Sequence, residues 1–162
     1  MFKETSKELL DFLSKSPTAF HAVENYRQIL NADGFKELLE SEHWDIVPGG
    51  KYYVTRNNTS ILAFKVGTKL DNYSFNIVTS HTDSPTFKVK ENAEIEVKNK
   101  YTQLNTEGYG GMLCATWLDR PLSIAGRVLV SEGNSIVTKL LNIDRDLLMI
   151  PNVAIHMNRA AN

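Results

Sequence analysis

The spacing of the apolar residues changes once in the first part of this chain, and that change limits the folds that the chain can adopt. Up to Gly34 the apolar residues recur at helical spacing, whereas after Pro48-Gly49-Gly50 they alternate with polar residues. A period of 3.6 residues predicts amphipathic helices, and a period of two predicts half-buried strands. Helices followed by strands indicate a layered fold, so α/β is the fold class that we expect.

Two helices are expected before residue 35. The first carries a leucine stripe at helical spacing, and Thr5 with Glu8 has the spacing of a capping box. The second is expected to begin at Ser16-Pro17, a helix-entry signal, and to end at Gly34, since glycine is common just past the end of a helix. His21 is expected on the side of this second helix opposite to its apolar face.

The remainder of the chain is expected to consist mostly of strands and tight turns. The candidate strands are residues 51–57 with 60–66 as a hairpin, 73–80, 87–100 as a half-solvated strand pair, 126–130 with 135–141 as a hairpin, and 150–158. From about residue 87 onward the pattern is that of a β-rich domain, because charged and apolar residues alternate. The expected division of the chain is therefore residues 1–86 and residues 87–162.

Composition excludes several classes of protein. The formal net charge of the 162 residues is −1, so no basic surface is expected to attract nucleic acid or an anionic membrane. The single cysteine, Cys114, excludes an internal disulfide framework and is typical of a reducing compartment. The charged N-terminus lacks the apolar core of a secretory signal, and no apolar run approaches the ~20 residues of a membrane span. These observations predict a soluble cytoplasmic protein.

A histidine and an aspartate two residues apart follow the predicted strand at residues 73–80. In extended backbone, residues i and i+2 project to the same side, so the side chains of His81 and Asp83 would leave the strand end together. That end is where open α/β sheets place their ligands. A neutral imidazole nitrogen ligates zinc well, and a carboxylate behind the ring can orient it and raise its basicity. The residues alone leave two interpretations open, a metal ligand with a supporting carboxylate or a strand-end histidine followed by a turn.

A second histidine of interest lies in the last candidate strand. Val153, Ile155 and Met157 alternate there with residues that include His156. A strand would turn His156 away from the apolar face. The residue is therefore either a surface histidine or one that contacts a partner.

The sequence does not support other types of site. The histidines lack the His-x-x-x-His and His-x-x-Glu-His spacings of metal sites, and a single cysteine cannot form a Cys-x-x-Cys pair. The glycine-rich segment Gly108–Met112 lacks the Gly-Lys-Ser/Thr ending of a phosphate loop, so we interpret it as a tight turn. A small nucleotide-binding domain is therefore not supported. The chain contains no Gly-x-Ser-x-Gly element, the motif that would indicate a serine nucleophile.

Several segments in register resemble one enzyme family over nearly the whole chain. The first is SHTDSPTFKVK at residues 80–90, which is similar to the first metal-ligand motif of the aspartyl aminopeptidase/aminopeptidase I family of zinc metallopeptidases. The other similar segments are SPTAFHAV, GGKYYVTRN, YGGM followed by TWLDRPLSIAGRV, and IPNVAIHMNRAAN. Several long motifs in the expected order are far more specific than one His-x-Asp. The resemblance therefore favours the metal-ligand interpretation of His81.

The resemblance implies a two-zinc exopeptidase that removes N-terminal residues from peptides. His81 would bind one Zn²⁺ ion and Asp83 would support that ligand, while a water held between the two ions attacks the peptide carbonyl. The resemblance also implies a homo-oligomer, a tetrahedral dodecamer in the full-length form. His156 would reach into the active site of a neighbouring subunit, in agreement with its expected place away from the apolar face.

Members of this family are much longer than 162 residues, and this chain resembles an N-terminal fragment. Residues 1–86 would be the N-terminal part of the catalytic α/β domain, and residues 87–162 part of an inserted β-rich dimerisation domain. The bridging aspartate, the general-base glutamate and the other zinc ligands are expected beyond residue 162, so the chain alone is expected to be inactive. The alternative is a non-catalytic module that self-associates through its β-rich part. These residues decide neither the preferred N-terminal residue of the substrate nor the metal used in the cell.

Overall fold

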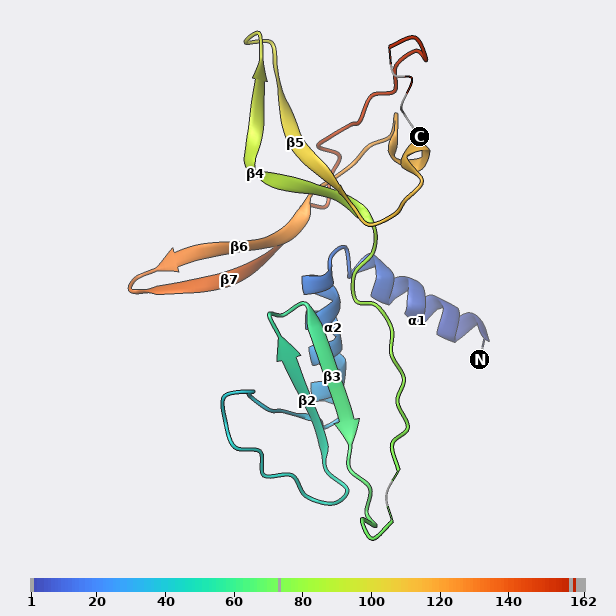
Figure 1. The fold of residues 1–162 in the computed structure, drawn as a ribbon, viewed down its shortest axis with the longest axis vertical. Coiled ribbons are helices and arrows are strands. Elements are labelled where there is room, and N and C mark those ends of the chain that lie inside the picture. The colour runs from blue at the N-terminus through green and yellow to red at the C-terminus, as the bar shows by residue number, and fades with distance from the viewer. Residues whose placement is uncertain (1, 73, 158, 160–162) are drawn as a thin grey trace. The chain divides into compact units, whose positions relative to one another are not determined.

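A computed structural model describes residues 2–72, 74–157 and 159, which form two compact units (Figure 1). The first unit comprises the chain up to Asp83 together with Ile124–Ile143, and the second comprises Ser84–Ser123 together with the chain from Asp144 onward. Helices and sheets are both present, so the predicted α/β class is confirmed. The division into domains at residues 86 and 87 stays a prediction.

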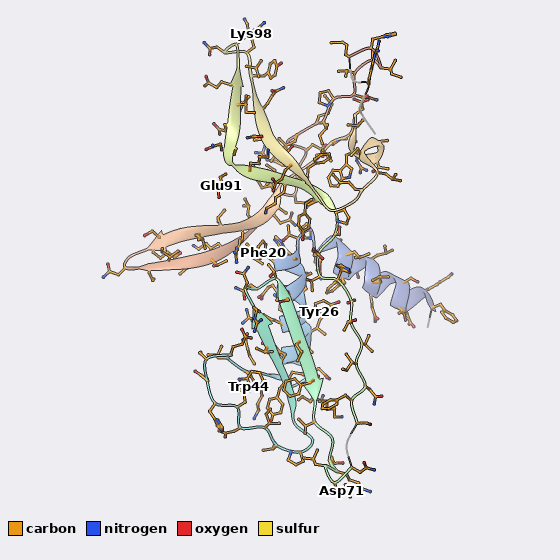
Figure 2. The ribbon with its side chains drawn as sticks, viewed as in Figure 1. Phe20, Tyr26, Trp44, Asp71, Glu91 and Lys98 are labelled. Atoms are coloured by element: carbon orange, nitrogen blue, oxygen red, sulfur yellow. The ribbon has the colours of Figure 1, made fainter. Side chains whose placement is uncertain are left out.

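Helix α1 opens the first unit at Phe2–Ser14. Because α1 begins at Phe2, Thr5 lies inside the helix and not at its N-cap, so the predicted capping box with Glu8 is wrong. The ring of Phe12 lies 4.8 Å from the ring of Tyr26, which Figure 2 labels on the second helix. This aromatic contact connects α1 to the second helix, α2 (Ala19–Ala32).

Helix α2, at Ala19–Ala32, has well-defined caps at both ends. At its start the Oγ1 atom of Thr18 accepts a hydrogen bond from the backbone N–H of His21, so the N-cap is Thr18 and not Ser16. At its end Gly34 has φ +80°, and the backbone N–H of Phe35 donates to the carbonyl of Leu30 at 2.9 Å. This is the Schellman arrangement, and it confirms the predicted end of the helix.

A three-stranded sheet follows α2. Its strands are β1 (Lys36–Glu37), β2 (Lys51–Arg56) and β3 (Ser60–Lys65), with β2 in the centre, parallel to β1 and antiparallel to β3. The turn between β2 and β3 has positive φ at both Asn57 and Asn58, and the N–H of Thr59 donates to the carbonyl of Arg56. Asparagine tolerates this conformation better than most residues, and the predicted hairpin is confirmed.

The core of the first unit lies between α2 and the sheet. The buried side chains that the structure describes in this unit are those of His21, Ala22, Val23, Tyr52 and Tyr53. Consecutive strand residues point to opposite faces, so Tyr53 faces α2, whereas Tyr52 lies on the other face of β2, near Val47 and Phe64. Figure 1 shows α2 behind β2 and β3, and the Tyr53 hydroxyl donates to Oδ1 of Asn31 on α2 at 3.0 Å. The expected place of His21 away from the apolar face is wrong, because His21 is buried together with Ala22 and Val23. Its Nδ1 lies 2.8 Å from Oγ1 of the N-cap residue Thr18, so the ring is held against the helix start.

The predicted strand at residues 73–80 is absent from the described part of the chain. Tyr73 lies outside the described residues, and residues 74–80 belong to none of the strands that the structure describes. The side chains of Phe75, Ile77 and Val78 are 78%, 78% and 96% exposed. A strand needs a neighbour to pair its backbone groups, and the described strands provide none for this segment.

A second hairpin belongs to the first unit although it comes late in the sequence. Strands β6 (Ala125–Glu132) and β7 (Ser135–Asn142) pair antiparallel through their full length, as the sequence predicts. The guanidinium of Arg127 on β6 lies 4.4 Å from the centre of the Phe20 ring on α2, and its Nη1 donates to the carbonyl and side-chain oxygens of Asn57 at 3.2 Å. Arg127 thus fixes the hairpin to the rest of the first unit.

The second unit contains one long hairpin and a short 3₁₀-helix. Strands β4 (Thr86–Val97) and β5 (Tyr101–Tyr109) pair antiparallel, and η1 spans Cys114–Trp117. The register shifts between Val89 and Glu94, and Figure 2 shows Glu91 where β4 bends and Lys98 at the tip. The strand pair predicted within residues 87–100 is thus wrong: a single bulged strand leads into the turn there, and its partner is residues 101–109.

Between β5 and η1 the glycine-rich segment forms a tight turn, as predicted. Gly110 has φ +76°, and a Cβ atom at this position would lie 3.3 Å from Cγ of Pro85. Glycine is therefore favoured here both by backbone conformation and by the close approach of the proline ring. The ring of Phe87 meets the ring of Trp117 edge to face, with 5.4 Å between their centres.

Candidate metal and catalytic residues

His81 and Asp83 lie at the end of the extended segment that follows β3. The Nδ1 atom of His81 is 3.0 Å from Oδ1 of Asp83, which is hydrogen-bonding distance. When the ring is neutral with its proton on Nδ1, that N–H donates to the carboxylate and Nε2 carries the free lone pair. The arrangement matches a metal-ligating histidine whose other nitrogen is held by a carboxylate. The structure therefore brings together the two residues that the sequence paired.

Thr82, between the two residues, contributes a contact that the sequence did not indicate. Its Oγ1 donates to the backbone carbonyl of Thr59 at 2.6 Å, and Thr59 lies in the turn between β2 and β3. This hydrogen bond attaches the segment with His81 and Asp83 to the turn of the three-stranded sheet. A threonine between a histidine and an aspartate gives no signal of this role, because the acceptor is 23 residues away.

A second His-x-Asp in the chain shows how different the same spacing can be. His43 and Asp45 are also two residues apart, but their closest contact is 3.7 Å and uses Nε2 of the histidine. Both side chains are more than 90% exposed, whereas the side chain of Asp83 is 38% exposed. The His43 pair therefore has neither the short contact nor the partly enclosed carboxylate of the His81 pair.

The described residues provide only part of a metal site. Within residues 2–72, 74–157 and 159 no three His, Cys, Asp or Glu side chains come together in a way that could hold a metal ion. Catalytic zinc usually has three protein ligands and one open position. His81 with Asp83 fits one ligand and its support, so a complete site needs ligands from other segments.

His156 lies in the second unit, in a turn and not in the predicted strand. Residues 151–157 form no strand, and the N–H of Met157 donates to the carbonyl of Ala154 at 2.8 Å across the turn. The predicted strand at residues 150–158 is therefore wrong over the residues described; Asn158 lies outside them. Ile155 and Met157 are 73% and 79% exposed, and His156 is exposed with them. His156 is therefore accessible because it lies in an exposed turn, and not because it lies on the polar face of a strand.

Comparison with known proteins shows the family to which this chain is related. The family model described as Aminopeptidase I zinc metalloprotease (M18) matches residues 12–162. The chain belongs to this family. The resemblance predicted from its motifs is confirmed, and the family is one of zinc-dependent aminopeptidases, which are hydrolases.

Curated members of the M18 family are similar over almost all of the chain. A probable M18 family aminopeptidase 2 of Clostridium novyi is 51% identical over 160 residues, which cover 97% of this chain and 37% of the relative. The aspartyl aminopeptidase of Dictyostelium discoideum is 45% identical over 159 residues, covering 97% of this chain and 33% of the relative. The chain thus spans about a third of the length of these relatives.

Solved structures of M18 proteins have the same fold in the matching part. The Chaetomium thermophilum mApe1 structure superposes with a TM-score of 0.88 at 36% identity, covering 96% of this chain and 36% of that one. The structure of the mApe1 dodecamer from Saccharomyces cerevisiae gives a TM-score of 0.83 at 30% identity, covering 96% of this chain and 37% of that one.

None of the helices in the described residues is both long enough and apolar enough to cross a membrane.

Proposed function

We propose that this chain supplies one zinc ligand, His81, and the residue that orients it, Asp83, to an aminopeptidase that removes N-terminal residues from peptides. The observation that carries the proposal is the 3.0 Å contact between Nδ1 of His81 and Oδ1 of Asp83, in a chain that belongs to a zinc metalloprotease family. That contact reserves Nε2 for the metal, because one ring nitrogen is already engaged.

The two residues have distinct roles in this proposal. Asp83 accepts the Nδ1–H of His81, which fixes the neutral tautomer and makes Nε2 a better donor to the metal. Thr82 keeps both residues at a fixed place by its hydrogen bond to the β2–β3 turn. When bound, zinc supplies an activated water and polarises the carbonyl of the scissile peptide bond. The histidine side chain is 91% exposed, so it can meet ligands from other segments.

The rest of the catalytic machinery belongs to parts of the enzyme outside these residues. The relatives are nearly three times as long as the matched segment, and no three ligands come together in the described residues. We assign two zinc ions per complete active site, with a bridging aspartate and a general-base glutamate from segments beyond residue 162. A cytoplasmic location, which the single cysteine favours, belongs to the same proposal.

His156 completes the active site of a neighbouring subunit in a homo-oligomer. A related structure is named a dodecamer, and His156 stands exposed in a turn from which it can reach another protomer. Hairpins β4–β5 and β6–β7 form two-stranded sheets with edges that can take part in subunit contacts. A tetrahedral dodecamer is the assembly that we expect of the full-length enzyme.

The test uses a full-length M18 protein that carries this sequence, assayed on aminoacyl-nitroanilides with zinc measured by elemental analysis. Asp83→Asn keeps the shape of the side chain but removes its charge, and we expect activity or zinc affinity to fall about 10–100-fold. His81→Ala removes a ligand and should cost more. The matched control is Asp45→Asn, in the His-x-Asp pair that lacks the short contact, and it should change neither quantity.

The outcomes separate the parts of the proposal. Wild-type zinc affinity and activity in Asp83→Asn would refute the orienting role of that carboxylate. Wild-type zinc content and turnover in His81→Ala would refute the site as a whole. The 162-residue chain by itself should bind zinc weakly and hydrolyse no substrate, and turnover by the metal-free chain would be equally decisive against the mechanism.

A further inference from the structure

The loop that carries His156 is held by one aspartate from a distant part of the second unit. Asp119, in the turn after η1, accepts a hydrogen bond at Oδ1 from the backbone N–H of Asn152 at 2.8 Å. Its own backbone N–H donates to the carbonyl of Ile150 at 3.0 Å. A single residue thus binds the backbone on both sides of Pro151, and it does so with its main chain and its side chain together.

The backbone of Asp119 adopts a conformation that few residue types tolerate. Its φ is +53°, in the left-handed region, where asparagine and aspartate are enriched and most other side chains are strained. This conformation accompanies the two contacts, in which the N–H meets Ile150 and the carboxylate meets Asn152. The residue at position 119 therefore meets two requirements: it tolerates the positive φ, and its side chain offers a hydrogen-bond acceptor.

From Asn152 the hydrogen bonds continue into the turn that contains His156. Oδ1 of Asn152 accepts the N–H of Val153 at 3.0 Å, and the turn from Ala154 to Met157 closes one residue later. Within the described residues, the hydrogen bonds seen from Val153 to Met157 are local to this loop. The contact between Asp119 and Asn152 is consequently the last connection from the body of the second unit before His156.

We propose that Asp119 is a positioning residue for His156, which it acts on through the loop from Ile150 to Met157. The inference rests on the function proposed above for His156 in a neighbouring active site. A ring that must enter a neighbouring subunit has to be held within about 0.5 Å of its productive place. Since His156 is exposed and residues 151–157 pair with no strand that the structure describes, the hydrogen bonds of Asp119 hold this part of the loop in place.

Three substitutions in the full-length protein separate the two properties of Asp119. Asp119→Asn keeps an acceptor oxygen and tolerates the positive φ. Asp119→Gly keeps the φ and removes the acceptor, whereas Asp119→Ala removes the acceptor and disfavours the φ. We expect kcat near that of the wild type for the first, and a loss of about 10–100-fold for the other two, as for a catalytic group displaced by about 1 Å.

Two readouts distinguish positioning from a general structural effect. Amide hydrogen exchange should become faster across residues 152–157 in Asp119→Gly, with unchanged zinc content and oligomeric state. In a His156→Ala background, Asp119→Gly should change kcat by less than about twofold, because the group that it positions is already gone. Asp146→Ala, at an exposed acid of the same unit, is the control and should match the wild type in both readouts.

Each result has a defined meaning. An equal loss of kcat with and without His156, or unchanged exchange and kcat in Asp119→Gly, overturns the positioning role and leaves the function proposed for His156 intact. A His156→Ala enzyme with wild-type kcat refutes that function, and with it the catalytic meaning of the contact. If Asp119→Ala does not fold, Asp119→Gly still decides, because it imposes no strain at φ +53°.

Discussion

Gly50 should not tolerate even a methyl group, although its backbone has no left-handed conformation to explain this. A Cβ atom at Gly50 would lie 2.5 Å from both Cε2 and the hydroxyl oxygen of Tyr52 and 2.7 Å from Cζ. The nearest of these contacts is 0.9 Å shorter than 3.4 Å, where ordinary van der Waals contact begins. The ring cannot move away freely, because Tyr52 is 5% exposed and its hydroxyl accepts a hydrogen bond from the N–H of Val47 at 3.1 Å.

The cost of Gly50→Ala follows from these contacts. Forcing a methyl group into a packed site typically costs about 1–3 kcal/mol, and losing the hydrogen bond from Val47 adds about 0.5–1.5 kcal/mol. We therefore expect the free energy of unfolding to fall by about 1.5–4.5 kcal/mol, from the sum of these ranges. Urea unfolding of the 162-residue chain followed by circular dichroism measures this change.

Gly126→Ala is the matched control for the same substitution. Gly126 lies in β6, and a Cβ atom there would meet nothing within 4 Å. The substitution should be neutral or stabilise the chain by up to about 1 kcal/mol, since alanine restricts the unfolded state. A Gly50→Ala chain as stable as the wild type, or an equal loss at both glycines, would show that the Tyr52 ring does not govern this position.

Two further predictions concern the buried polar groups of the first unit. Burial lowers the pKa of His21 in the folded chain, so the free energy of unfolding should be highest above about pH 6.5 and fall as the pH drops below that value, where the unfolded chain takes up the proton first. Urea unfolding between about pH 8 and pH 5 should show a smaller loss for His21→Asn and the wild-type loss for the exposed His43→Gln. Tyr53→Phe removes the hydroxyl that donates to Asn31 and should lower the free energy of unfolding by about 0.5–1.5 kcal/mol in the same assay at neutral pH, and an unchanged midpoint would contradict this role.

The elements that the sequence predicted well are those that local interactions determine. The end of α2 follows from Gly34, and the β2–β3 hairpin follows from two consecutive asparagines that accept positive φ. Residues 74–80 and 151–157 carry strand-like sequence but form no strand, because pairing depends on segments far away in the chain. Alternating apolar residues indicate that a segment can form a strand, but they do not show whether a partner strand is present.

The candidate site shows the same limit. His43-x-Asp45 and His81-x-Asp83 are indistinguishable by spacing, and only the structure shows that one pair has a 3.0 Å contact through Nδ1 and the other a 3.7 Å contact through Nε2. The family motif around residue 81 favours the second pair as the metal-binding one, which stays a prediction. The hydrogen bonds of Thr82 and Asp119 could not be predicted, because their partners are 23 and 33 residues away.

The return of β6 to the first unit has a consequence for synthesis on the ribosome. Arg127 on β6 contacts Phe20 and Asn57 of the first unit. The 40 residues from 84 to 123, which separate β6 from the earlier part of the first unit in the sequence, belong to the second unit. The first unit lacks its last hairpin until Ile143 has been added, 60 residues after Asp83. At about 5–20 residues per second this takes about 3–12 s. During that interval the face of Phe20 that later receives the guanidinium is open to water and to chaperones, so we expect α2 to be the element that they contact longest.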